Sequence, residues 1–88
     1  MDSALPRALS GLATAWPDAT WTPDGDGDEQ TGFYGWIGGR VVFATLMEPD
    51  DERVTGGLRW EACIGDDVTL GRTAVEAVRL VLGRVAGG

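Results

Sequence analysis

The dipeptide Gly38-Gly39 constrains the fold of this chain more than any other feature, because it separates two runs rich in β-forming residues. The first run covers residues 33–37 and the second covers residues 40–47. Glycine adopts the positive φ angles of a type I′ turn without strain, so this arrangement predicts a two-residue β-hairpin. The second run is apolar on both faces, which indicates a central strand of a sheet.

A third strand is predicted over residues 58–64, where side chains alternate between two faces. One face carries Leu58, Trp60, Ala62 and Ile64, and the other carries Arg59, Glu61 and Cys63. This alternation is typical of an antiparallel strand with one buried and one hydrated face. Residues 19–22 and 68–70 are candidates for additional short strands.

Two amphipathic helices enclose these strands in the sequence. The first is predicted over residues 3–16, because Leu5, Leu9, Leu12 and Trp16 recur at helical spacing. The second begins at Thr73, which forms a capping-box pattern with Glu76. Its apolar stripe is Val75, Val78, Leu82 and Val85, widened by Leu80 and Val81.

The expected architecture is one α+β domain over residues 1–88, with the order α-β-β-β-α. The strands form an antiparallel three-stranded meander, or a four-stranded one if residues 19–22 pair, and both helices cover one face. The open face would bear some of Tyr34, Trp36, Val42, Ala44, Leu46, Arg59, Glu61 and Cys63. An apolar face left in water usually marks an interaction surface, either for a second copy or for another protein.

Charge narrows the choice of partner. Fourteen carboxylates face seven cations, all arginine, and the net charge is −7. Because phosphate binding depends on clustered Lys and Arg, we expect neither direct nucleic-acid binding nor attachment to an anionic membrane.

Much of the acidity should gather at one end of the sheet, because in a meander the loop entering residues 33–37 and the loop leaving residues 40–47 share an end. These two loops hold Asp24, Asp26, Asp28, Glu29, Glu48, Asp50, Asp51 and Glu52. The sequence therefore predicts an anionic patch that binds a partner protein with a basic surface, with Tyr34 and Trp36 as partner-facing aromatic residues. The alternative is that these loops are simply well solvated.

The usual catalytic side-chain combinations are missing. Without histidine there is no Ser-His or Cys-His nucleophile pair, and Cys63 has no evident base. The glycines at 35–39 lack the lysine and hydroxyl residue of a phosphate-binding loop. We therefore expect a protein that is not an enzyme and that needs no cofactor.

The run from Asp24 to Asp28 resembles the start of an EF-hand calcium loop, with carboxylates at positions 1, 3 and 5. The pattern then departs, because position 6 is Glu29 instead of Gly and position 12 is Gly35 instead of Glu. No metal site is assigned, and a protein that responds weakly to divalent ions is the least favoured functional hypothesis.

Two further resemblances are short. The order α-β-β-β-α is similar to that of the double-stranded-RNA-binding domain, but this chain has no lysine for the basic helix start of that family. The segment Gly71-x-Thr73-x-x-Glu76-Ala77 resembles a Gly-Asp-Thr-x-x-Glu-Ala segment of HicB-type antitoxins, with Arg72 in place of Asp. Seven residues, mostly a capping box, assign no family.

The leading hypothesis is a non-catalytic binding module or inhibitor that engages a basic or nucleic-acid-binding protein through the acidic loops and open sheet face. A phage-type inhibitor or an antitoxin-like role would fit it. The alternative is a structural or accessory domain that homodimerises through the sheet, with acidity serving only solubility. One cysteine, no signal-peptide pattern and no long apolar run favour a cytoplasmic location.

Overall fold

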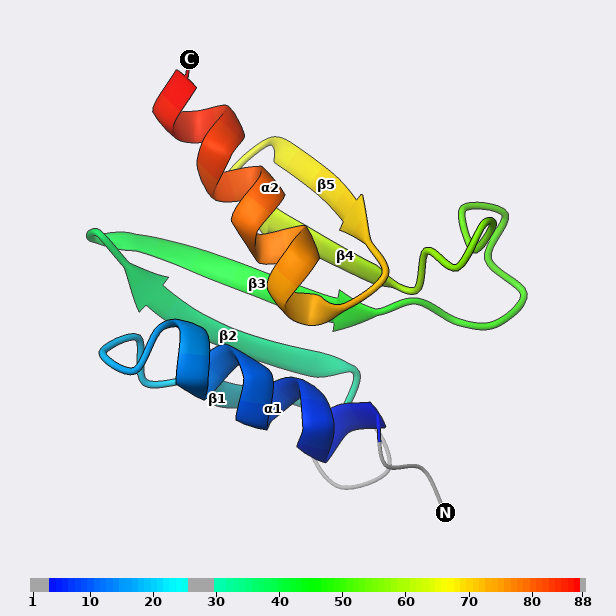
Figure 1. The fold of residues 1–88 in the computed structure, drawn as a ribbon, viewed down its shortest axis with the longest axis horizontal. Coiled ribbons are helices and arrows are strands. Elements are labelled where there is room, and N and C mark those ends of the chain that lie inside the picture. The colour runs from blue at the N-terminus through cyan, green and yellow to red at the C-terminus, as the bar shows by residue number, and fades with distance from the viewer. Residues whose placement is uncertain (1–3, 26–29, 88) are drawn as a thin grey trace.

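The structure, a computed structural model, describes residues 4–25 and 30–87. These residues form two helices and one antiparallel sheet of five strands, which lie in the sheet in chain order (Figure 1). The elements are α1 (Ala4–Ala15), β1 (Thr22–Asp24), β2 (Gly32–Ile37), β3 (Arg40–Leu46), β4 (Trp60–Ile64), β5 (Asp67–Gly71) and α2 (Ala74–Gly87). The α+β class and the meander are confirmed, whereas the sheet has more strands than the three or four expected.

The hairpin between β2 and β3 forms as predicted. Both turn glycines have positive φ angles, 59° at Gly38 and 79° at Gly39. Ile37 lies directly opposite Arg40, so the turn contains two residues. This register places Trp36 opposite Val41.

The possible fourth strand was predicted over residues 19–22, whereas the structure has it at Thr22–Asp24. A strand through residues 19–22 is interrupted at Thr20, whose φ of 52° lies in the left-handed region. The next residue, Trp21, donates a hydrogen bond from its indole Nε1 to the Leu12 carbonyl oxygen at 3.2 Å. Pro23 can then occupy an edge strand, where a missing N–H costs no ladder bond. At the other edge, the extension at 68–70 is part of the full strand β5, paired along its length with β4.

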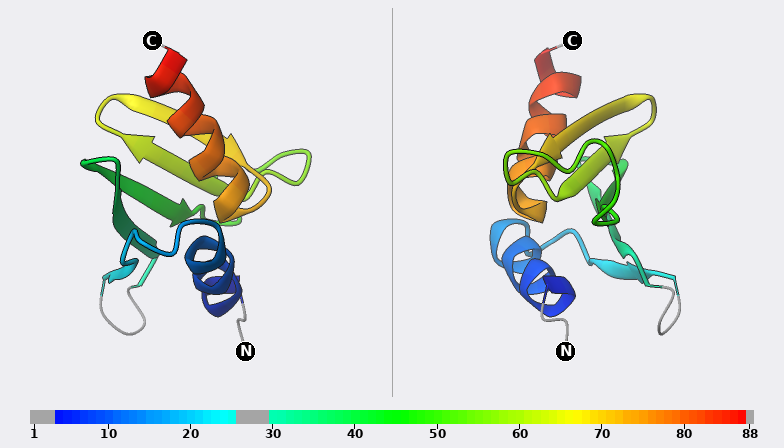
Figure 2. Two further views of the ribbon diagram at one scale, coloured as in Figure 1. Left: turned by 60° about the vertical axis from the view of Figure 1, so that its left-hand side comes forward. Right: turned by 90° about the vertical axis from the view of Figure 1, so that its right-hand side faces the viewer.

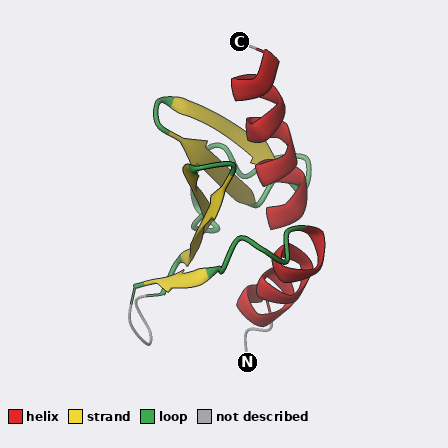
Figure 3. Cartoon of the chain, turned by 90° about the vertical axis from the view of Figure 1, so that its left-hand side faces the viewer, coloured by secondary structure: helices red, strands yellow, loops and turns green. Residues whose placement is uncertain are grey.

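Both helices lie on the same side of the sheet (Figure 3). The views of Figure 2 show α2 crossing above β4 and β5, with α1 beside it. Between the helices and the sheet lies a core of buried side chains. Its members include Leu12, Phe33, Val42, Ala44, Trp60, Ala62, Ile64, Ala77, Val78 and Val81. We call this covered side of the sheet the inner face.

Helix α2 begins as the capping pattern predicts, because the backbone N–H of Glu76 donates to Thr73 Oγ1 at 3.0 Å. Its apolar stripe differs in one residue from the prediction. Val81 is fully buried, whereas Leu80 is 48% exposed on the solvent side. Within residues 4–25 and 30–87, neither helix combines the length and apolarity that crossing a bilayer requires.

Candidate functional site

The side of the sheet opposite the helices is here called the outer face. The strand registers place one row of side chains across all five strands of the sheet. That row is Thr22, Tyr34, Phe43, Cys63 and Val68, and Trp36 and Val41 lie beside it toward the β2–β3 turn. Neither helix covers this face (Figure 3), and Trp36 is 59% exposed and Val68 42% exposed.

The row has an aromatic centre. The rings of Tyr34 and Phe43 lie with centroids 5.9 Å apart and an interplanar angle of 40°. Tilted aromatic pairs of this kind hold one another in place and present a rigid apolar surface. The outer face therefore offers a preformed, partly exposed aromatic surface.

The face assignment predicted for β3 was wrong. Val42 and Ala44 were expected on the open face, but both are fully buried under the helices, and Leu46 lies opposite inward-facing Trp60. Val41 and Phe43 occupy the outer face instead. The two-residue turn already implies this result, because it pairs Trp36 with Val41 and thereby places both on one face.

The outer face changes character along the strands. Toward the loop between β3 and β4, the next row across the sheet contains Asp24, Gly32, Thr45, Glu61 and Leu70. Two carboxylates thus border the aromatic row on one side, whereas Trp36 and Val41 border it on the other. Apolar surface and negative charge are segregated on the same face.

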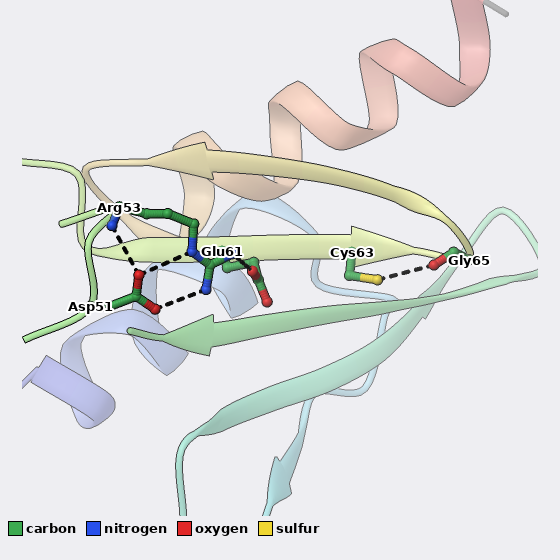
Figure 4. A network of polar contacts seen from close by, with 5 residues as sticks. All are labelled: Asp51, Arg53, Glu61, Cys63 and Gly65. Atoms are coloured by element: carbon green, nitrogen blue, oxygen red, sulfur yellow. Dashed lines mark hydrogen bonds and ion pairs between the residues drawn. The ribbon is translucent and has the colours of Figure 1, made fainter. Parts of the chain in front are cut away.

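An arginine of the β3–β4 loop ties that loop to the outer face (Figure 4). Arg53 donates to the Asp51 carboxylate from Nε at 3.1 Å and from Nη2 at 3.0 Å, and its Nη1 donates to Glu61 Oε2 on β4. The backbone N–H of Arg53 adds a bond of 2.9 Å to Asp51 Oδ1. The Arg53 side chain therefore connects this loop to the acidic part of the outer face.

These contacts change the acidity of the carboxyl group at their centre. Hydrogen bonds from the Arg53 side chain, and then from its backbone, lower the pKa of Asp51 from 3.8 to about 2. The hydrogen bonds that the Arg53 side chain donates to Asp51, and next the one to Glu61, raise the pKa of Arg53 above its ordinary value. Asp51 is thus already paired, which leaves Glu48, Asp50 and Glu52 as the exposed carboxylates of this loop.

The two acidic loops leave the same end of the sheet. The carbonyl oxygen of Thr31, at the end of the first loop, accepts a hydrogen bond from the backbone N–H of Leu46 at 2.8 Å. Gln30 and Thr31 also line one shallow hollow together with Glu48 and Pro49. Of the first loop's predicted partner-binding residues, Asp24 ends β1, and Asp26, Asp28 and Glu29 lie outside the described residues.

Cys63, in the centre of the outer face, is poorly suited to nucleophilic chemistry. Partial burial raises its pKa, and the charges of Glu61, Asp66 and Asp67 raise it further. Its Sγ donates to the Gly65 carbonyl oxygen at 3.2 Å. A protonated thiol of this kind acts as a small apolar contact at neutral pH.

Side chains that could bind a metal ion do not gather elsewhere among the described residues. Within residues 4–25 and 30–87, no group of three or more His, Cys, Asp and Glu side chains is arranged to hold a metal ion. Most of the calcium-loop-like run, including Asp26 and Asp28, lies outside these residues.

Comparison of the chain with protein-family models, with curated proteins and with solved structures found no match.

Proposed function

We propose that this protein is a non-catalytic binding module that engages the basic surface of a partner protein through the outer face of its sheet. The observation that carries the proposal is the aromatic row of the outer face, containing Tyr34 and Phe43, beside a loop rich in exposed carboxylates. Those carboxylates belong to Glu48, Asp50 and Glu52, whereas Glu61 is already paired with Arg53. Exposed apolar surface supplies affinity, and flanking charge selects a partner of opposite sign.

Charge complementarity favours a basic partner over a second copy of this chain. Each copy carries a net charge of −7, so face-to-face pairing would bring like-charged rims together. A basic protein would instead meet the carboxylates of Glu48, Asp50 and Glu52 beside the outer face. Because nucleic-acid-binding proteins present such basic surfaces, an inhibitory role at one of them is consistent with this proposal.

Selection of short random peptides on the immobilised protein tests the chemistry of the partner. We expect the enriched peptides to combine net positive charge with apolar or aromatic residues. Enrichment of acidic or uncharged peptides, or no enrichment, would contradict the proposal.

A matched pair of substitutions then locates the binding face. Val68→Ser removes an exposed apolar side chain from the outer face, and Leu80→Ser removes one of similar exposure, 48% against 42%, from α2. We expect Val68→Ser to weaken binding of an enriched peptide about fivefold and Leu80→Ser to leave it unchanged. Equal effects, or a larger effect of Leu80→Ser, would place the binding site elsewhere.

A charge-matched pair tests the acidic loop. The triple variant Glu48→Gln, Asp50→Asn, Glu52→Gln should weaken binding of the same peptide about tenfold at low salt and less at high salt. The control is Asp66→Asn, Asp67→Asn, Glu76→Gln, which removes the same charge elsewhere. If both triples weaken binding equally, only the net charge matters and the patch has no role.

Light scattering over a range of concentrations separates this function from homodimerisation. We expect a monomer for the wild-type chain. A dimer that Val68→Ser dissociates would support the alternative, a domain that self-associates through its outer face, and would overturn the proposal.

A further inference from the structure

A hollow of about 440 Å³ lies where the segment after α1 passes the end of β2. Its walls include the two tryptophans Trp16 and Trp36, together with Pro17, Asp18 and Ile37. Residues 16 and 36 are distant in sequence, and the fold brings them to one place. We call this feature the tryptophan hollow.

Backbone and core contacts fix the walls of the tryptophan hollow. The backbone N–H of Trp36 donates to the Ala19 carbonyl oxygen at 3.0 Å, and Ala19 is buried. Trp16 is held from behind by Trp21, with ring centroids 6.3 Å apart in an edge-to-face arrangement. The backbone of the hollow and the Trp16 ring are therefore held in place before a ligand enters, which limits the ordering that binding requires.

The chemistry of the walls suits a cation. Indole faces attract cations through their quadrupole, and tryptophan does so more strongly than the other aromatic residues. Asp18 adds an exposed carboxylate on the rim. No arginine of the described residues lines this hollow, whereas Arg7 and Arg72 both line the hollow between α1 and the start of α2.

Among cationic groups, a guanidinium fits this combination best. It is planar, stacks on aromatic rings, is weakly hydrated and can donate two parallel hydrogen bonds to a carboxylate. The hollow adjoins the apolar side of the outer face, because Trp36 belongs to both. A partner that covers the outer face can therefore reach it.

We infer that the tryptophan hollow binds an arginine side chain of the basic partner, with Trp16 and Trp36 contacting the guanidinium and Asp18 pairing with it. This inference rests on the proposed function and specifies the residue type that the partner must supply. The tryptophan hollow lies at the end of β2 opposite the acidic loops, so it would contact the partner at a second place on the molecule.

The test uses the indole N–H resonances of the protein's four tryptophans in two-dimensional NMR spectra, assigned by Trp→Phe variants. The probe is N-acetyl-arginine amide, and the matched control is N-acetyl-citrulline amide, which has nearly the same shape without the charge. We expect saturable shifts of Trp16 and Trp36 with the arginine probe, at a Kd on the order of 10 mM. Trp60, which is 5% exposed, should not respond and serves as the internal reference.

Two substitutions at exposed positions test the assignment without endangering the fold. Trp36→Leu should weaken binding of the arginine probe about fivefold or more, and Asp18→Asn should weaken it about threefold. The control Asp66→Asn should leave the affinity unchanged. Equal shifts with the citrulline probe, no response of Trp36, or unchanged affinity in Trp36→Leu would overturn the inference.

Failure of this inference can be told apart from failure of the proposed function. If basic peptides are enriched and depend on Val68 but the arginine probe leaves Trp36 unaffected, only the tryptophan hollow is wrongly assigned. If no basic peptide is enriched, the proposed function itself fails, whatever the response of the hollow.

Discussion

Both faces of the sheet carry apolar side chains, yet the helices cover only the inner one. On the inner face the strands carry small residues such as Ala44 and Ala62, both fully buried, so the helices can approach closely. On the outer face the facing positions hold the larger Phe43 and Trp36, and no helix covers them. Because the inner face also holds the large side chains of Phe33 and Trp60, size does not distinguish the two faces, and contact with the helices decides which one forms the core.

The largest expected effect comes from the two phenylalanines, one on each face. Phe33→Ala on the inner face, where the side chain is 2% exposed, should lower the free energy of unfolding by about 3–4 kcal/mol. Phe43→Ala on the outer face should lower it by only about 1 kcal/mol, because its ring is already partly in water. Urea denaturation of both variants measures the difference, and equal losses would show that the outer face is part of a continuous core.

A glycine at the contact between β5 and α2 tests the closeness of the inner-face packing. A Cβ added to Gly71 would lie 2.6 Å from the backbone nitrogen of Ala77 and 3.0 Å from its Cα. Gly71→Ala must therefore push α2 away from the sheet, at a cost of about 1–3 kcal/mol in thermal or chemical unfolding. An unchanged stability would contradict the close approach of α2 and β5.

Gly83 in α2 is the matched control, because a Cβ there meets no atom within 4 Å among the described residues. Since an interior helical glycine is less favourable than alanine, Gly83→Ala should raise the free energy of unfolding by about 0.5–1 kcal/mol. A loss of stability would mean that this side of α2 is packed and not solvent-facing.

The smallest effect concerns the loop that Arg53 connects to the outer face. In the folded state the pKa of Asp51 is lowered from 3.8 to about 2, so its contacts with Arg53 stabilise the fold above pH 3.8 and are lost as pH falls toward 2. Arg53→Gln removes the guanidinium but keeps the backbone N–H bond to Asp51, so it should raise the pKa of Asp51 part of the way toward 3.8. Stability should change little because both side chains are solvent-accessible. Carboxyl chemical shifts followed by NMR titration measure this change, and an unchanged pKa in Arg53→Gln would exclude the Arg53 side chain as its cause.

Local sequence signals were enough to predict the hairpin, the capped start of α2 and the alternation of β4. The turn at Gly38-Gly39 follows from the φ preference of glycine, and the start of α2 follows from the contact of Thr73 with Glu76. Both features depend on interactions within a few residues of the chain, which is why sequence predicted them.

The edges of the sheet were harder to predict, because they depend on contacts distant in sequence. Strand β1 begins at Thr22, after the left-handed Thr20 (φ 52°) and after Trp21, whose indole donates to the distant Leu12 carbonyl oxygen and lies against Gly35. Strand β5 is supported by α2, where Thr69 Oγ1 donates to the Ala77 carbonyl oxygen at 2.6 Å. Neither contact leaves a periodic signal in the sequence.

The candidate site was predicted in part. Tyr34 and Trp36 do lie on the outer face, but Phe43 and Val68 were missed, although the register of a two-residue turn was sufficient to identify Phe43. The ion pairs of Arg53 could not be predicted, because they depend on where the loop of residues 47–59 places Arg53 relative to β4, which no local pattern of the sequence determines.

The most direct test of the central claim, that the outer face is the binding surface, is to map the backbone amide shifts caused by an enriched basic peptide. We predict that the changes concentrate on β2, β3 and β4, around Tyr34, Phe43 and Glu61, and extend into the β3–β4 loop. Changes confined to α1 and α2, with the outer face unaffected while the peptide is bound, would contradict the claim.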